Sequence, residues 1–253
     1  MKKVTKNFSV LALHKDQFDY ETKLLQEKKP NQGCWARVQK DLAKLYNYKC
    51  AYCEIDLRKT TTTVEHYRPK AKDKYFWLAH EWTNFMPCCP DCQDDKKGKG
   101  SQFETENPPQ YNVPLLPNGN LDYEKCRLDS EYLLSEKPLI LNPEIDNPAE
   151  HLGFNTQNGE LLPKNNSKKG EATIRIVNLK RKQLNFYRKQ VVDNFFDDID
   201  KYYEVFREKS LDNPLLLALE VMKKEVKKKV DMQAEFSFVW QYIFDNFEAI
   251  LQE

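Results

Sequence analysis

Hydrophobic residues recur at helical spacing in two separate parts of the chain. Near the N-terminal end, Trp35, Val38, Leu42 and Leu45 are three or four residues apart, which predicts one amphipathic helix. After Gly170 the same spacing returns in three successive runs, Leu184 to Phe206, Leu215 to Val230 and Phe236 to Ile250. The pair Asn213-Pro214 marks the start of the second run, because proline suits the first helical turn. The C-terminal part is therefore predicted to be helical.

Between these helical parts the pattern changes twice. The β-branched residues 60–64 predict a strand that leads to Glu65 and His66, and Pro69 ends it. From Gln102 to about Lys169 prolines and Asn-Gly pairs are frequent, which predicts loops with short strands at 132–134 and 139–141. The interpretation is an α+β chain.

We expect three regions on this basis. Residues 1–105 would hold an N-terminal segment and a catalytic core, residues 106–170 a loop-rich connection, and residues 171–253 a helical region. The helical region would either pack on the core as a bundle or offer its amphipathic terminal helix to a partner.

Composition narrows the function classes. The chain has 253 residues, a net charge of +1 and 31% charged residues, so it does not coat nucleic acid by bulk charge. The chain has no apolar run near the roughly 18 residues that cross a membrane, so a cytoplasmic protein without membrane contact is expected. It also lacks a Walker-type phosphate loop, so any use of ATP would come from a partner.

Two cysteine pairs predict a metal centre. Cys50-x2-Cys53 and Cys89-x2-Cys92 together supply four thiolates, the usual ligands of a closed structural zinc site. In a reducing compartment such pairs indicate metal rather than disulfides. Cys88 is a second choice of ligand.

The segment between the cysteine pairs contains an acidic residue followed by histidine. Hydrolysis of a phosphodiester needs water, a base and a cation near the phosphate. His66 is the expected base, because histidine titrates near neutral pH. Glu65 and the amide oxygen of Gln93 are the expected ligands of Mg²⁺, with Mn²⁺ as an alternative. Adjacent strand residues point to opposite faces, so the strand must end or bend here for both to serve one phosphate.

These motifs resemble the HNH, or ββα-metal, endonuclease family in its four-cysteine zinc form. The resemblance implies a zinc-stapled ββα-metal core, with Glu65 as metal ligand and His66 as general base. It implies that Asn84 orients the loop and that Lys96 is the trailing lysine. Gln93 stands where this family usually has Asn or His, a departure that affects metal coordination.

The wider sequence resembles the PtuB-type HNH proteins of Septu and retron-linked anti-phage systems. The similar segments extend from about Trp35 to Arg188 and include 65–70, 75–79, 81–84, 141–148 and 173–174. This resemblance implies an ABC-type ATPase partner, PtuA-like, and a role in anti-phage defence.

Basic residues gather around the expected site, which indicates contact with nucleic-acid phosphates. Arg68, Lys70, Lys96 and Lys97 are the candidate contacts; a solvated surface is the alternative. DNA is favoured as the substrate, and RNA, such as tRNA, remains an alternative. Because of Gln93, a zinc-binding nucleic-acid module with weakened catalysis is a further alternative, as is an adaptor that acts through its C-terminal helices.

Overall fold

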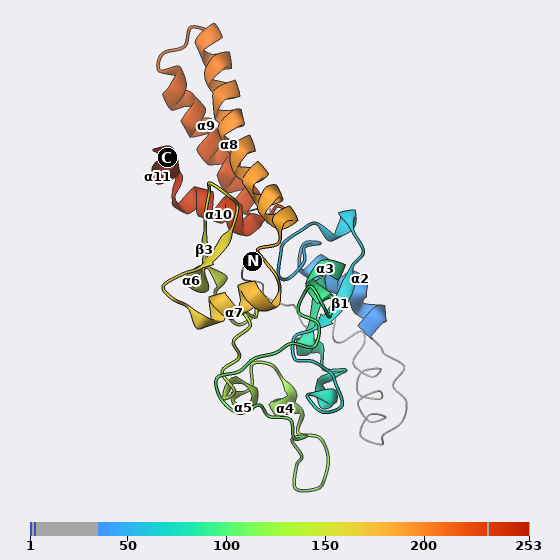
Figure 1. Cartoon of the computed structure of the whole chain (residues 1–253). Coiled ribbons are helices and arrows are strands. Elements are labelled where there is room, and N and C mark those ends of the chain that lie inside the picture. Colours follow the sequence, from blue (N-terminus) through green and yellow to red (C-terminus); the bar gives the residue numbers. More distant parts are fainter. Residues whose placement is uncertain (2, 4–34, 232, 253) are drawn as a thin grey trace.

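The computed structural model describes residues 1, 3, 35–231 and 233–252, so most of the expected N-terminal lead-in lies outside the described residues. A long helical hairpin, α8 and α9, extends from one end of the molecule (Figure 1). The segment that carries the cysteine pairs lies beside the base of this hairpin, and the short helices α4 and α5 lie at the opposite end.

The core of the cysteine-rich part is one helix on a two-stranded sheet. Helix α2 (Trp35–Leu45) packs on strands β1 (Thr63–His66) and β2 (Phe85–Cys88). The predicted helix is confirmed, with Val38 and Leu42 fully buried. The strands are antiparallel, and Glu65 lies opposite Met86 and His66 opposite Phe85.

The predicted strand at 60–64 begins later than expected. The 3-10 turn η1 (Leu57–Lys59), capped by Asp56, precedes it, and the ladder starts only at Thr63. β1 therefore includes Glu65 and His66 and ends at His66. Two further turns, η2 (Phe76–Leu78) and η3 (Trp82–Asn84), lead into β2, and the short helix α3 (Pro90–Gln93) follows it.

The middle region is loop-rich, as predicted, but its expected strands are wrong. Residues 132–134 belong to helix α5 (Glu131–Leu134), because the Ser130 hydroxyl accepts the Leu133 N–H and caps a helical turn. Residues 139–141 belong to no strand; Leu139 N–H instead donates to Glu104 O at 2.8 Å. The other elements are α4 (Tyr123–Cys126), α6 (Pro148–His151), β3 (Leu152–Phe154) and β4 (Leu161–Pro163), of which β3 and β4 pair antiparallel.

The C-terminal region is helical, as predicted. Helices α7 (Lys168–Ile176), α8 (Lys182–Glu208) and α9 (Pro214–Asp231) are followed by α10 (Ser237–Asp245) and α11 (Phe247–Ile250), so the last expected helix is divided at Asn246. α8 packs along α9, and α10 packs against both. Among the described residues, no helix combines the length and apolar character that a membrane crossing requires.

Glu54 joins the C-terminal helices to the first cysteine pair. Its carboxylate accepts the Ser237 hydroxyl at 2.8 Å and the Phe238 N–H at 2.9 Å, both at the start of α10. Burial would raise the pKa of Glu54, but nearby positive charge, including Lys49, and these hydrogen bonds lower it to about 2. The buried carboxylate therefore stays ionised and connects positions 183 or more residues apart.

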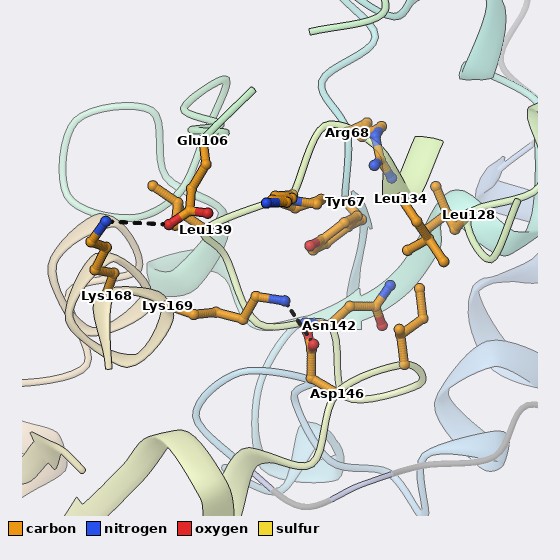
Figure 2. A pocket seen from close by; sticks show the side chains of 13 residues that line it. Tyr67, Arg68, Glu106, Leu128, Leu134, Leu139, Asn142, Asp146, Lys168 and Lys169 are labelled. Carbon is orange, nitrogen blue, oxygen red and sulfur yellow. Dashed lines mark hydrogen bonds and ion pairs between the residues drawn. The ribbon is translucent and has the colours of Figure 1, made fainter. Parts of the chain in front are cut away.

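Arg68 lies in the interior rather than on the nucleic-acid surface expected for it. Its guanidinium pairs with Glu136 at 2.8 Å, and both side chains are completely buried. The rings of Tyr67, Tyr75 and Phe103 lie 5.2 to 5.7 Å from the guanidinium carbon. Arg68 and Tyr67 border a cleft of about 450 Å³ on the side of the middle region (Figure 2). Arg68 therefore connects the end of β1 to the loop after α5.

Replacing Glu136 tests this connection. Glu136→Gln leaves the Arg68 charge buried without its counter-ion, which is expected to lower the free energy of unfolding by about 3 kcal/mol. Urea denaturation followed by circular dichroism measures this free energy of unfolding. Glu131→Gln, an exposed change in the adjacent α5, is the control and should change stability by less than about 0.5 kcal/mol. Equal stability of the two variants would contradict a structural role for the pair.

Candidate metal centre and active site

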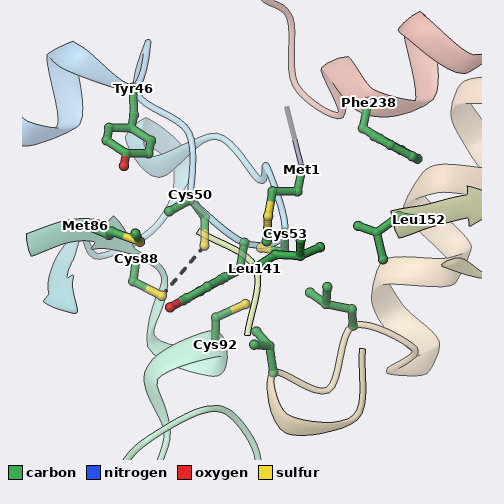
Figure 3. Close-up of a cluster of buried hydrophobic side chains, with 14 of the residues drawn as sticks. Met1, Tyr46, Cys50, Cys53, Met86, Cys88, Cys92, Leu141, Leu152 and Phe238 are labelled. Carbon is green, nitrogen blue, oxygen red and sulfur yellow. Dashed lines mark hydrogen bonds between the residues drawn. The ribbon is translucent and has the colours of Figure 1, made fainter. Parts of the chain in front are cut away.

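Four buried cysteines converge in the interior. The sulfur atoms of Cys50, Cys53, Cys89 and Cys92 all lie within 4.8 Å of one another. Figure 3 shows the sulfurs of Cys50, Cys88 and Cys92 directed toward the same interior space. In the part of the chain that the structure describes, no other group of three or more cysteine, histidine or acidic ligand atoms comes together in this way.

Local backbone geometry brings the two cysteine pairs together. After α2 the chain turns sharply through Asn47 and Tyr48, both in the left-handed region at φ 51° and 56°. Ala51 N–H then donates to Pro87 O at 2.9 Å, which joins the first pair to the end of β2. Cys89 precedes α3, with Pro90 at its first position, so that Cys92 lies on the first turn of this helix.

The donor set fits a structural zinc ion. Four thiolates in a closed, buried cluster are the ligands that such a zinc prefers. Their excess negative charge is met by Arg181, which lies just before α8 and whose Nη2 is 3.5 Å from Cys92 Sγ. Burial would lower the pKa of Arg181, but the nearby Cys92 and Cys53 sulfurs raise it. Cys88 remains outside the set, with its sulfur 3.8 Å from that of Cys50.

His66 is held in one orientation at the end of β1. Its Nε2 lies 3.0 Å from Ala79 O, and because a carbonyl only accepts, this nitrogen carries the proton. Nδ1 is therefore the ring atom with a lone pair. The ring makes edge contacts with Trp35 and Phe85, at centroid distances of 5.2 and 5.0 Å. Burial is the main cause that lowers the pKa of His66, to about 3, so the imidazole is neutral at neutral pH.

Asn84 fixes the backbone that follows His66. Its Oδ1 accepts the Arg68 N–H at 2.7 Å, and its Nδ2 donates to Arg68 O at 3.0 Å and to Leu78 O at 3.2 Å. Asn84 is fully buried and does not border the candidate active-site cleft. These hydrogen bonds join Asn84 to the backbone after His66 and to the end of η2.

Glu65 and His66 border one cleft of about 520 Å³. β1 ends at His66, and both residues line this cleft together with Gln93 from α3. Lys70, Asp94 and Asp95 are further charged residues of its wall. The arrangement brings the expected base beside the two expected metal ligands.

Glu65 and Gln93 each have a partner within the chain. Glu65 Oε1 accepts the ammonium of Lys99 at 2.6 Å, and Gln93 Nε2 donates to Val64 O at 2.8 Å. Glu65 is thus paired with a cation of the chain itself, and Gln93 presents an N–H to β1. A Mg²⁺ ion on Glu65 would therefore compete with the Lys99 ammonium for Oε1.

The expected basic residues are divided by the fold. Lys70 is exposed beside the cleft, with its ammonium 4.9 Å from the Trp35 ring. Lys96 and Lys97 are exposed on the loop after α3, where Asp94 Oδ1 accepts both of their backbone N–H groups. These three lysines lie where a polyanion could contact them.

Comparisons with known proteins agree with the motifs. The chain is 32% identical over 166 residues to the Septu protein PtuB of Bacillus mycoides (strain KBAB4), a match that covers 61% of this chain and 50% of that protein. It is 26% identical over 178 residues to the Septu protein PtuB of Bacillus thuringiensis, covering 68% of this chain and 53% of the relative. The chain is therefore similar to Septu PtuB proteins over part of their length.

The similarity is partial in extent. The chain spans about half the length of these PtuB relatives. It is also 28% identical over 200 residues to a Septu protein PtuA of Bacillus mycoides (strain KBAB4), covering 74% of this chain but only 25% of that protein. No protein-family model matches the chain.

Three residues make important contacts that the sequence did not predict. Lys99, in the basic stretch after the second cysteine pair, is completely buried against Glu65. Glu136 and Arg181 are distant in sequence from the residues that they neutralise. Only Lys99 carried a local signal, because Gly98 and Gly100 enclose it in a chain with just 7 glycines.

Replacing single cysteines tests the zinc centre. The purified chain is expected to contain one zinc ion, and Cys92→Ser should remove it, because three thiolates no longer close the tetrahedron. Plasma mass spectrometry measures the zinc content. Cys88→Ser and Cys126→Ser replace buried cysteines outside the set and should keep the metal. Loss of zinc in Cys88→Ser would show that the ligand set is wrong.

Proposed function

We propose that this chain is the nuclease subunit of a Septu-type anti-phage complex and that it hydrolyses phosphodiester bonds of nucleic acid, with DNA favoured. The observation that carries this proposal is the state of His66. Its Nε2–H is bound to Ala79 O, so the neutral ring offers Nδ1 as a proton acceptor at a cleft.

In the proposed reaction, Nδ1 of His66 takes a proton from a water molecule as the water oxygen attacks phosphorus. The bond from phosphorus to the leaving oxygen breaks, and this oxygen takes a proton from solvent water to leave as a hydroxyl group. The charges of Lys70 and Lys99 contribute, after burial, to the low pKa of His66. An anionic phosphate beside the ring opposes that effect, which makes the histidine a better base when the substrate is bound.

The charged residues of the cleft wall suggest that binding of a nucleic acid there requires added cations. Glu65 is neutralised by Lys99, which leaves Asp94 and Asp95 against Lys70 in the wall. A polyanion that enters therefore meets no excess of positive charge. Glu65 and Gln93 are the residues proposed to take a divalent cation, Mg²⁺ or Mn²⁺. Because Glu65 is paired with Lys99 as the chain is folded, we assign the ion no step.

Lys70, at the cleft wall, and Lys96 and Lys97, outside the cleft, are proposed to hold the nucleic-acid backbone. Phosphate contacts position a strand without reading its sequence, so cleavage with little sequence preference is expected. The division into a core (1–105), a connecting region (106–170) and a helical region (171–253) is part of the same proposal.

The proposed partner is an ABC-type ATPase, PtuA-like. The resemblance to PtuB-type proteins supports this partner. The sequence has no phosphate loop of its own, which agrees with ATP binding by a partner. We also propose a cytoplasmic location, as expected from a sequence without an apolar run long enough to cross a membrane.

A second candidate is a zinc-stapled module that binds nucleic acid without cutting it. The pairing of Glu65 with Lys99 favours this candidate, because the acidic residue is not available to a metal as the chain is folded. RNA, such as tRNA, is the alternative substrate within the nuclease proposal. Parallel assays on matched DNA and tRNA separate the two substrates.

Replacing His66 tests the nuclease proposal. His66→Ala is expected to lower Mg²⁺-dependent cleavage by the complex about 10²- to 10⁴-fold, because the water loses its base. Gel electrophoresis of labelled substrates measures the rate. His151→Ala, in α6 and outside the cleft, is the matched control and should cleave like the wild type.

Folding is checked separately in these variants. Zinc content and circular dichroism should match the wild type, and His66→Asn provides a polar replacement if His66→Ala is unstable. Undiminished cleavage by a folded His66 variant would show that His66 is not the general base. Nucleic-acid binding without cleavage by the wild-type complex would support the second candidate.

A further inference from the structure

Lys99 fills a small oxygen cage at the back of the candidate active site. Its ammonium donates to Glu65 Oε1 at 2.6 Å, His66 O at 3.0 Å and Gly100 O at 3.3 Å. Three N–H bonds thus meet three oxygen acceptors, and the side chain is completely buried. One carboxylate and two carbonyls are the kind of oxygen donors that a hard cation also uses.

The backbone is built to deliver this lysine. Lys99 N–H donates to Cys92 O at 2.8 Å, which holds the loop against α3. A Cβ at Gly98 would come within 2.4 Å of Asp91 O, so only glycine permits this approach. Gly100 adopts φ +46°, and a Cβ there would lie 2.6 Å from the Asp95 Cα. The two glycines let the chain turn inward and back out at Lys99.

A divalent ion and this ammonium would compete for the same carboxylate oxygen. An ion bound to Glu65 Oε1 at about 2.1 Å would share that oxygen with the ammonium, and both are positive. The cost of bringing these charges together in a buried site is high. Removing the ammonium alone would leave Glu65 buried without a counter-ion, which favours uptake of another cation.

We propose that Lys99 is the resident cation of the active site and that a divalent ion binds Glu65 only by displacing the Lys99 ammonium. Lys99 is then a positioning residue that sets how readily the site accepts metal. The chain folds with the site neutralised, and metal loading requires the Gly98–Gly100 loop to release its lysine. The inference rests on the proposed function for the identity of the competing ion.

Metal binding by a Lys99 variant tests the displacement. Lys99→Met is expected to bind Mn²⁺ at least about tenfold more tightly than the wild-type chain, because a competing charge at ion-pair distance is gone. Electron paramagnetic resonance of free Mn²⁺ measures the affinity. Lys72→Met removes the same charge from an exposed position nearby and should leave the affinity within about twofold. This gain in Mn²⁺ affinity should vanish in the double variant that carries both Lys99→Met and Glu65→Gln.

A second measurement uses the wild type, in case Lys99→Met does not fold. Acetic anhydride should leave the buried Lys99 amine unmodified without metal, and Mn²⁺ should expose it to acetylation, measured by mass spectrometry. Lys72 should be acetylated equally in both conditions. Lys99 that stays unmodified when Mn²⁺ fills the site would overturn the inference, as would a folded Lys99→Met that binds Mn²⁺ no more tightly.

These results separate the inference from the proposed function. Tighter Mn²⁺ binding by Lys99→Met, with no cleavage by any form of the complex, would support displacement of the Lys99 ammonium by metal. The same result would contradict the proposed nuclease activity. Mg²⁺-dependent cleavage by the wild type, with no gain of affinity in Lys99→Met, would keep the nuclease and overturn the displacement.

Discussion

The convergence of four buried thiols is the constraint on which the rest of the site depends. The sheet beside them has two strands of four residues, and such a small sheet is marginally stable alone. Neither α2 nor α3 is long enough to hold it without help. A metal held by Cys50, Cys53, Cys89 and Cys92 would join the end of α2 to the start of α3 and so close the structure around the sheet.

The same centre controls the candidate active site through adjacent residues. Cys92 and Gln93 are neighbours in α3, so the position of the thiolate sets where the amide meets β1. Cys92 O also accepts the Lys99 N–H, and Lys99 in turn holds Glu65 and the His66 carbonyl. A disturbance at the thiolates is therefore transmitted to both residues of the acidic-histidine pair within a few bonds.

Local patterns in the sequence predicted the longer helices and the cysteine cluster, but not the short elements of the middle region or the partners of buried charges. The spacing of Trp35 to Leu45 and the Asn213-Pro214 signal predicted α2 and the start of α9, because burial on one face and proline geometry act over a few residues. The cysteine spacing predicted the cluster for the same reason. Arg68 was misjudged because Glu136, 68 residues away, meets it only after folding. The short strand expected at 132–134 failed because the Ser130 cap outweighed the strand preference of its residues.

Two buried ion pairs enclose the segment that carries the catalytic candidates. Lys99 holds Glu65 at one end, and Glu136 holds Arg68 at the other. Buried pairs add little net stability, because removing two charges from water costs about as much as their attraction returns. We infer that their main effect is to fix position, since each cation also donates to a backbone carbonyl, of His66 or of Leu133. The four residues from Glu65 to Arg68 are thus fixed at both ends, with the His66 ring between them.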